Sequence, residues 1–142
     1  MKKVINFSLF LASITILLIS ACEPVEDPTN SDARDPYVGE WNFNEQKSTA
    51  KLAYVVYISK DPYNSSQVLL ENFGSSGIPG DVVKAVVTSG QMVIAKQTMS
   101  GSGWITEGSG QMSNPAKTAM TLNYYFIIGA DKETHVTTAT KQ

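Results

Sequence analysis

Length, composition and charge bound the class of protein. The chain has 142 residues, of which 42% are hydrophobic, and its formal net charge is −2, so one small domain with a packed core is expected. The single arginine, Arg34, and the lack of a basic stripe exclude a phosphate-binding surface, and we expect no nucleic acid partner. Because Cys22 is the only cysteine, a disulfide within the chain is excluded.

Residues 1–21 have the order of a secretory signal. Lys2 and Lys3 precede an apolar run over 4–19, which is shorter than the roughly 20 residues that a membrane-spanning helix needs. The run closes on Ile19-Ser20-Ala21-Cys22, which resembles the lipobox of bacterial lipoproteins. That resemblance implies diacylation of the Cys22 thiol, cleavage before it and acylation, typically with palmitate, of the new amino terminus. Two or three acyl chains would hold the protein on the membrane for a long time.

A tether is predicted between this anchor and the domain. Residues 23–35 contain two prolines and several acids and almost no large apolar side chain, so they cannot bury enough surface to order themselves. We therefore expect a lipidated flexible tether over residues 22–36, which lifts a domain of residues 37–142 off the lipid surface.

From residue 37 onward, short β-branched and aromatic runs alternate with clusters of Gly, Ser, Asn, Asp and Pro, which is typical of an all-β chain. No helical period of useful length appears, and the short connections favour antiparallel pairing of neighbours. Eight strands that pair in this way tend to close, so we predict an antiparallel up-and-down barrel. The predicted strands cover residues 38–45, 52–59, 67–73, 82–87, 91–97, 103–108, 118–128 and 134–140.

Period-two alternation identifies the inward face of two strands. In the seventh strand, Leu122, Tyr124 and Phe126 share one face with the apolar residues at 120 and 128. In the first strand, Trp41 and Phe43 lie opposite Glu40 and the asparagines at 42 and 44.

Gly39-Glu40-Trp41 resembles the Gly-x-Trp opening of the lipocalins and calycins. The spaced glycines between residues 101 and 110, the strand over 120–128 and the final Thr-Ala-Thr at 138–140 resemble small lipocalin-like lipoproteins of Gram-negative gut bacteria. The resemblance covers residues 35–141. It implies that Gly39 and Trp41 form a motif at the closed end of the barrel, where a basic side chain packs on the ring; the candidates are Lys132 and Lys141.

No catalytic or metal-binding constellation is found. His135 is the only histidine, so we expect an exposed strand residue and no metal site. The serines of the Gly-Ser-Gly segments at 101–103 and 108–110 do not fit Gly-x-Ser-x-Gly, and these glycines are better explained by bulges or bends. The carboxylates are scattered without a spacing that predicts a pair. We therefore expect neither an enzyme nor a cofactor.

Two functions follow from these patterns. The first is a non-enzymatic, membrane-anchored lipoprotein that binds a small apolar or amphipathic ligand inside the barrel, with Phe43, Tyr54, Tyr124 and Phe126 as the candidate ligand-binding residues. The second is an interaction or structural lipoprotein whose barrel is filled by side chains and which contacts envelope proteins through its loops and outer surface. Either would lie in the cell envelope of a Gram-negative bacterium, anchored to the outer membrane and facing the periplasm or the cell surface.

Overall fold

The computed structural model describes residues 31–46 and 51–142. The predicted signal, Cys22 and most of the predicted tether lie outside these ranges. The described chain contains one short 3-10 turn, η1, and eight strands. Their bounds are β1 Gly39–Gln46, β2 Lys51–Lys60, β3 Gln67–Glu71, η1 Phe73–Ser75, β4 Val82–Val87, β5 Gln91–Thr98, β6 Ile105–Met112, β7 Ala119–Ile128 and β8 Asp131–Lys141.

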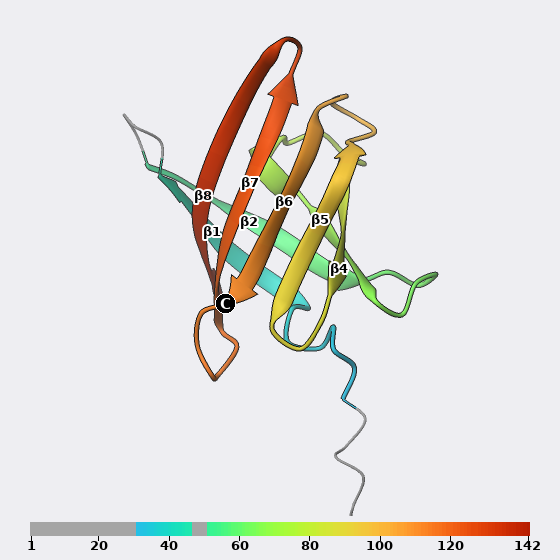
Figure 1. Cartoon of the computed structure of the whole chain (residues 1–142), viewed down its shortest axis with the longest axis vertical. Helices are drawn as coiled ribbons and strands as arrows, with labels where there is room; N and C mark the ends of the chain where they lie inside the picture. Colours follow the sequence, from blue (N-terminus) through green and yellow to red (C-terminus); the bar gives the residue numbers. More distant parts are fainter. Residues whose placement is uncertain (1–30, 47–50) are drawn as a thin grey trace, which may run out of the picture. The chain divides into compact units, whose positions relative to one another are not determined.

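The eight strands form a closed barrel in chain order (Figure 1). Every neighbouring pair is antiparallel, and β1 pairs with both β2 and β8 and so closes the sheet. The prediction of an eight-stranded antiparallel up-and-down barrel is confirmed. No helix in residues 31–46 and 51–142 is long and apolar enough to cross a membrane.

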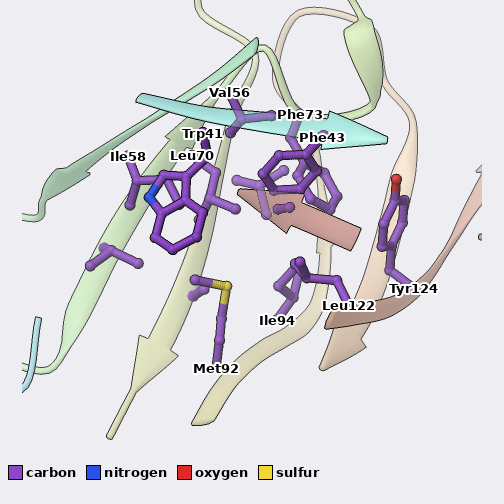
Figure 2. Packing of buried hydrophobic residues seen from close by; sticks show 14 of the residues in the cluster. Trp41, Phe43, Val56, Ile58, Leu70, Phe73, Met92, Ile94, Leu122 and Tyr124 are labelled. Carbon is purple, nitrogen blue, oxygen red and sulfur yellow. The ribbon is translucent and has the colours of Figure 1, made fainter. Parts of the chain in front are cut away.

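Strict alternation explains which side chains fill the barrel. In β1 the side chains of Trp41, Phe43 and Glu45 are buried, whereas those between them are exposed. The same period places Tyr124 and Phe126 of β7 in the interior. Figure 2 shows side chains from several strands meeting in one core around Trp41, Met92 and the aromatic rings.

The Gly-x-Trp segment lies at the end of the barrel that the chain before β1 covers. The Trp41 indole donates a hydrogen bond to the carbonyl of buried Tyr37 at 2.7 Å. Lys141 places its ammonium 5.8 Å from the centroid of the Trp41 ring and donates to the carbonyl of Pro36 at 3.1 Å. Of the two candidates, Lys141 therefore takes the position over the tryptophan, and Lys132 instead lies over Tyr125.

Residues 32–36 differ from the flexible tether that the sequence predicts. The Arg34 guanidinium donates to the carbonyls of Asp61 and Asn64, each at 3.0 Å, and also pairs with Asp32. Lys60 of β2 pairs with the same Asp32 carboxylate at 2.9 Å. Charge pairs and carbonyl contacts thus order this segment on the barrel without large apolar side chains.

The glycines of β6 do not mark a bulge, because the pairing of β6 with β7 runs without a shift through Gly108 and Gly110. The strand was predicted to end at Gly108 but continues through Gly110 to Met112. A Cβ atom on Gly108 would lie 2.4 Å from the Cβ of Tyr124, so glycine lets β6 and β7 approach closely. The irregularity in pairing lies on β5 instead, between Ile94 and Gln97.

Candidate functional site

Strand register brings five polar side chains together inside the barrel. Glu45 of β1 is the cross-strand partner of Thr137 in β8, and Tyr124 of β7 is the partner of His135 in β8. Tyr54 reaches the same place from β2. Glu45, His135 and Thr137 are 2%, 6% and 0% exposed. We call Glu45, Tyr54, Tyr124, His135 and Thr137 the polar cluster.

The Glu45 carboxylate is the centre of the polar cluster. Tyr54 donates to its Oε1 atom at 2.6 Å, and the hydroxyl of Tyr124 donates to the same oxygen. The Tyr124 oxygen also lies 3.2 Å from those of Tyr54 and Thr137. The second carboxylate oxygen, Oε2, lies 3.3 Å from Nδ1 of His135. One buried carboxylate therefore accepts hydrogen bonds from β2 and β7 and faces the imidazole of β8.

Burial changes the acidity of both phenols. Removal from water raises the pKa of Tyr54 far above its usual value, and the neighbouring Tyr124 and Glu45 raise it further. The pKa of Tyr124 is raised chiefly by burial and next by its hydrogen bond to Glu45. Both hydroxyls therefore stay protonated at neutral pH and act as hydrogen-bond donors toward the carboxylate.

An aromatic group packs beside the polar cluster. The ring of Phe73 lies among those of Tyr124, Phe126 and Phe43, with centroid distances of 4.6, 5.7 and 6.1 Å. Phe73 belongs to η1 and not to a strand, and it is fully buried. Figure 2 shows Phe43 and Phe73 side by side in the core. A loop residue thus fills the space between inward-facing strand residues.

The four residues predicted to bind a ligand are all brought together. Phe43, Tyr124 and Phe126 are buried, Tyr54 is half-buried, and Phe43 packs on Tyr54 with centroids 5.7 Å apart. Phe43, Tyr124 and Phe126 each pack on Phe73, and the Tyr54 hydroxyl lies 3.2 Å from that of Tyr124. The outer surface of the described barrel has grooves, one of which has a volume of about 490 Å³ and lies over β5, β6 and β7.

Three members of the polar cluster, Glu45, His135 and Thr137, are not among the site residues that the sequence predicts. His135 was predicted to be exposed, and this is wrong: its ring is 6% exposed and stacks on Tyr124 with centroids 5.2 Å apart. Glu45 was not singled out at all. The available signal was period-two alternation, because Glu45 follows Trp41 and Phe43 on the inward face.

Two loops cover the end of the barrel near Phe73. The Asp81 carboxylate accepts hydrogen bonds from the backbone N–H groups of Gly101 and Ser102, at 2.7 and 2.9 Å. Trp104, at the end of the second loop, packs on Phe126 with centroids 5.5 Å apart. The segment that carries Phe73 and the segment between β5 and β6 are therefore tied together at Asp81.

Within the ranges that the structure describes, no group of three or more His, Cys, Asp or Glu side chains could hold a metal ion. The polar cluster offers one carboxylate, one imidazole and three hydroxyls for hydrogen bonding.

Comparisons with known proteins show the fold and no family. No family model matches the sequence, and no curated protein matches it. A solved structure, EF1p2_mFAP2b bound to DFHBI, is similar with a TM-score of 0.51 and 13% sequence identity, over 78% of this chain and 98% of that chain. This likeness supports the barrel and fits a lipocalin-like architecture only coarsely.

Proposed function

We propose that this chain is a non-enzymatic lipoprotein, anchored at Cys22 in the cell envelope, which binds a small apolar or amphipathic molecule inside the barrel. The binding site would lie where the polar cluster meets Phe43, Phe73 and Phe126. The observation that carries this proposal is the burial of Glu45 and His135 among aromatic rings.

A barrel that serves only as a scaffold has no need of such a cluster. Buried charged and polar groups stabilise a fold less well than apolar side chains of similar volume, and they occur preferentially at functional sites. A small number of polar groups in an aromatic wall is also the usual composition of a small-molecule site. Eight strands enclose enough room either for side chains or for one small ligand.

Room for a ligand would come from Phe73. Its ring occupies the space that Phe43, Tyr124 and Phe126 surround, and it is carried by η1 and not by the barrel wall. A shift of η1 would open that space without breaking the pairing between strands. The likeness to EF1p2_mFAP2b supports this proposal, since that protein is bound to DFHBI and has a similar barrel fold.

Native mass spectrometry tests the proposal. The purified chain, incubated with a lipid extract and released into the gas phase, is expected to carry a small molecule that appears separately after denaturation. Phe73→Ala should increase the bound fraction because it enlarges the site. Met92→Ala makes a comparable cavity in another part of the core and should not. Clean ligand-free masses for all three proteins would contradict ligand binding.

The packing itself favours a second function. The interior aromatic side chains contact one another, as expected of a filled barrel, and Tyr57, Val93 and Val136 expose 49%, 52% and 54% of their surface. In this alternative the protein contacts envelope partners through its loops and outer surface. Crosslinking at residue 93 or 136 in whole cells, combined with ligand-free masses, would favour this function over ligand binding.

A further inference from the structure

The two nitrogens of the His135 imidazole have different surroundings: one faces a carboxylate, and the other has no hydrogen-bond partner among the described residues. Its ring is held between Tyr124, on which it stacks at an interplanar angle of 10°, and Phe126, whose ring centroid is 5.4 Å away. Nδ1 faces the Glu45 carboxylate at 3.3 Å. Nε2 is buried and has no hydrogen-bond partner among the residues that the structure describes.

The neighbours of the ring determine which nitrogen carries the proton. A carboxylate oxygen only accepts hydrogen bonds, so the nitrogen that faces Glu45 is favoured as the protonated one. The remaining polar neighbour of Nε2, the Glu133 carboxylate, lies 3.7 Å away, beyond hydrogen-bond distance. In the neutral ring, Nε2 then carries a buried lone pair to which no group donates a hydrogen bond.

We propose that Nε2 of His135 is the hydrogen-bond acceptor for the ligand, and that the ligand is an uncharged apolar molecule with a hydroxyl group. This inference rests on the proposed function and narrows its ligand class. The hydroxyl donates to Nε2, and the apolar body packs on Phe126 and Tyr124. A ligand without a donor leaves the buried nitrogen unpaired, so it lacks one hydrogen bond that the hydroxyl ligand makes and binds less tightly.

The same geometry disfavours an anionic ligand such as a fatty acid. Carboxylates of Glu45 and Glu133 lie on the two sides of the His135 ring. Among the described residues, neither is paired with a lysine or arginine that could receive an anion. A ligand carboxylate next to Nε2 would meet two like charges.

The single histidine makes the test direct, because ¹⁵N-histidine labelling of the full chain gives one pair of ring signals. The probes are 4-butylphenol, butylbenzene and 4-butylbenzoate, which share one apolar body. Without a probe, we expect Nδ1 to be protonated and Nε2 not. On addition of 4-butylphenol, the Nε2 signal should shift while Nδ1 keeps its proton.

Affinities supply the second readout. The wild-type chain should bind 4-butylphenol about tenfold more tightly than butylbenzene, and 4-butylbenzoate most weakly. His135→Phe keeps an aromatic ring but no acceptor, and it should abolish the preference for the phenol. Val136→Ala, a change of the neighbouring outward-facing residue, should preserve that preference.

The outcomes separate this inference from the function on which it rests. Three results would overturn the role of His135 and leave ligand binding in place. They are equal affinities for the phenol and the hydrocarbon, tightest binding of the benzoate, and a proton on Nε2 at neutral pH without a probe. If none of the three probes binds, the inference fails, and the proposed function fails with it only when the lipid extract also leaves ligand-free masses.

Discussion

At the scale of single residues, Gly74 decides whether Phe73 can enter the core. Gly74 has φ +69°, and a Cβ atom there would lie 2.4 Å from the ring of Phe126. Gly74→Ala therefore adds both backbone strain and overpacking, and we expect a loss of roughly 3 kcal/mol in the free energy of unfolding. Urea denaturation measures this loss.

Gly77→Ala is the matched control, because Gly77 has φ +62° but open space around it. This substitution should lower the free energy of unfolding by only about 1 kcal/mol. Equal losses would show that Phe126 yields freely.

Asp81 gives the loop contact a pH dependence. Burial alone would raise the pKa of its carboxyl group, but hydrogen bonds from Ser102, Gly101 and Ser76 outweigh burial and hold the pKa below its usual value. The carboxylate therefore stabilises the fold at neutral pH, and this contribution is lost as the pH falls from the unfolded pKa through the folded one. Asp81→Asn should cost about 1 kcal/mol at pH 7, and the difference from wild type should shrink below about pH 4. Denaturation curves at both pH values check this; a constant difference would contradict it.

At the scale of elements, the Glu45 carboxylate connects β1 to β2, β7 and β8 through phenol and imidazole groups. The raised pKa of Tyr54 means that its neutral form is favoured in the fold, so its contribution is present below about pH 10 and is lost as the pH rises. Tyr54→Phe should cost about 2 kcal/mol at pH 7, and the gap should narrow in alkaline solution. Unfolding followed at pH 7 and pH 11 measures it, with Tyr63→Phe as the control for removal of an exposed phenol. A gap that widens with pH would contradict this role.

The strands show what the sequence could predict. Local alternation is enough to place β1 and β7, since Phe43 and Phe126 repeat every second residue with their apolar neighbours. It fails at the end of β3, which was predicted to reach Phe73 but ends at Glu71, because Asn72 adopts φ +60° and turns the chain into η1. Local alternation also does not explain Gly108 in β6, because the side chain that approaches it belongs to Tyr124, 16 residues later in the chain and on the neighbouring strand.

The polar cluster was harder to predict for the same reason. The side chains of Tyr54 and Tyr124 could be placed in the interior from their own strands. The contact between His135 and Glu45, in contrast, joins residues that lie 90 positions apart in the chain and come near each other only when β1 pairs with β8. The local sequence shows only that Glu45 is a polar residue at an inward position. That it lies next to His135 follows only from the register of the closed barrel.

At the scale of the whole barrel, the chain before β1 closes the end that holds Trp41. The Tyr37 ring is fully buried there, its carbonyl accepts the Trp41 indole N–H, and burial raises its pKa to about 12. Tyr37→Ala should therefore create a cavity and lower the free energy of unfolding by about 3 to 5 kcal/mol, as for other large aromatic side chains in cores. Tyr63→Ala is the matched control: this tyrosine lies at the same end, in the loop that Arg34 contacts, but is 97% exposed, so it should change stability by less than about 0.5 kcal/mol.

Chemical denaturation followed by tryptophan fluorescence measures the stability of both variants, because Trp41 lies at this end of the barrel and Trp104 at the other. If Tyr37→Ala lost no more stability than Tyr63→Ala, the segment before β1 would rest on the barrel without closing it. If the loss is as large as expected, the barrel depends on a segment outside its strands at this end, just as it depends on Phe73 at the other. Two side chains from outside the strands, Tyr37 at one end and Phe73 at the other, would then fill the interior. If Phe73 moved out of the core, Tyr37 would still close the end that holds Trp41.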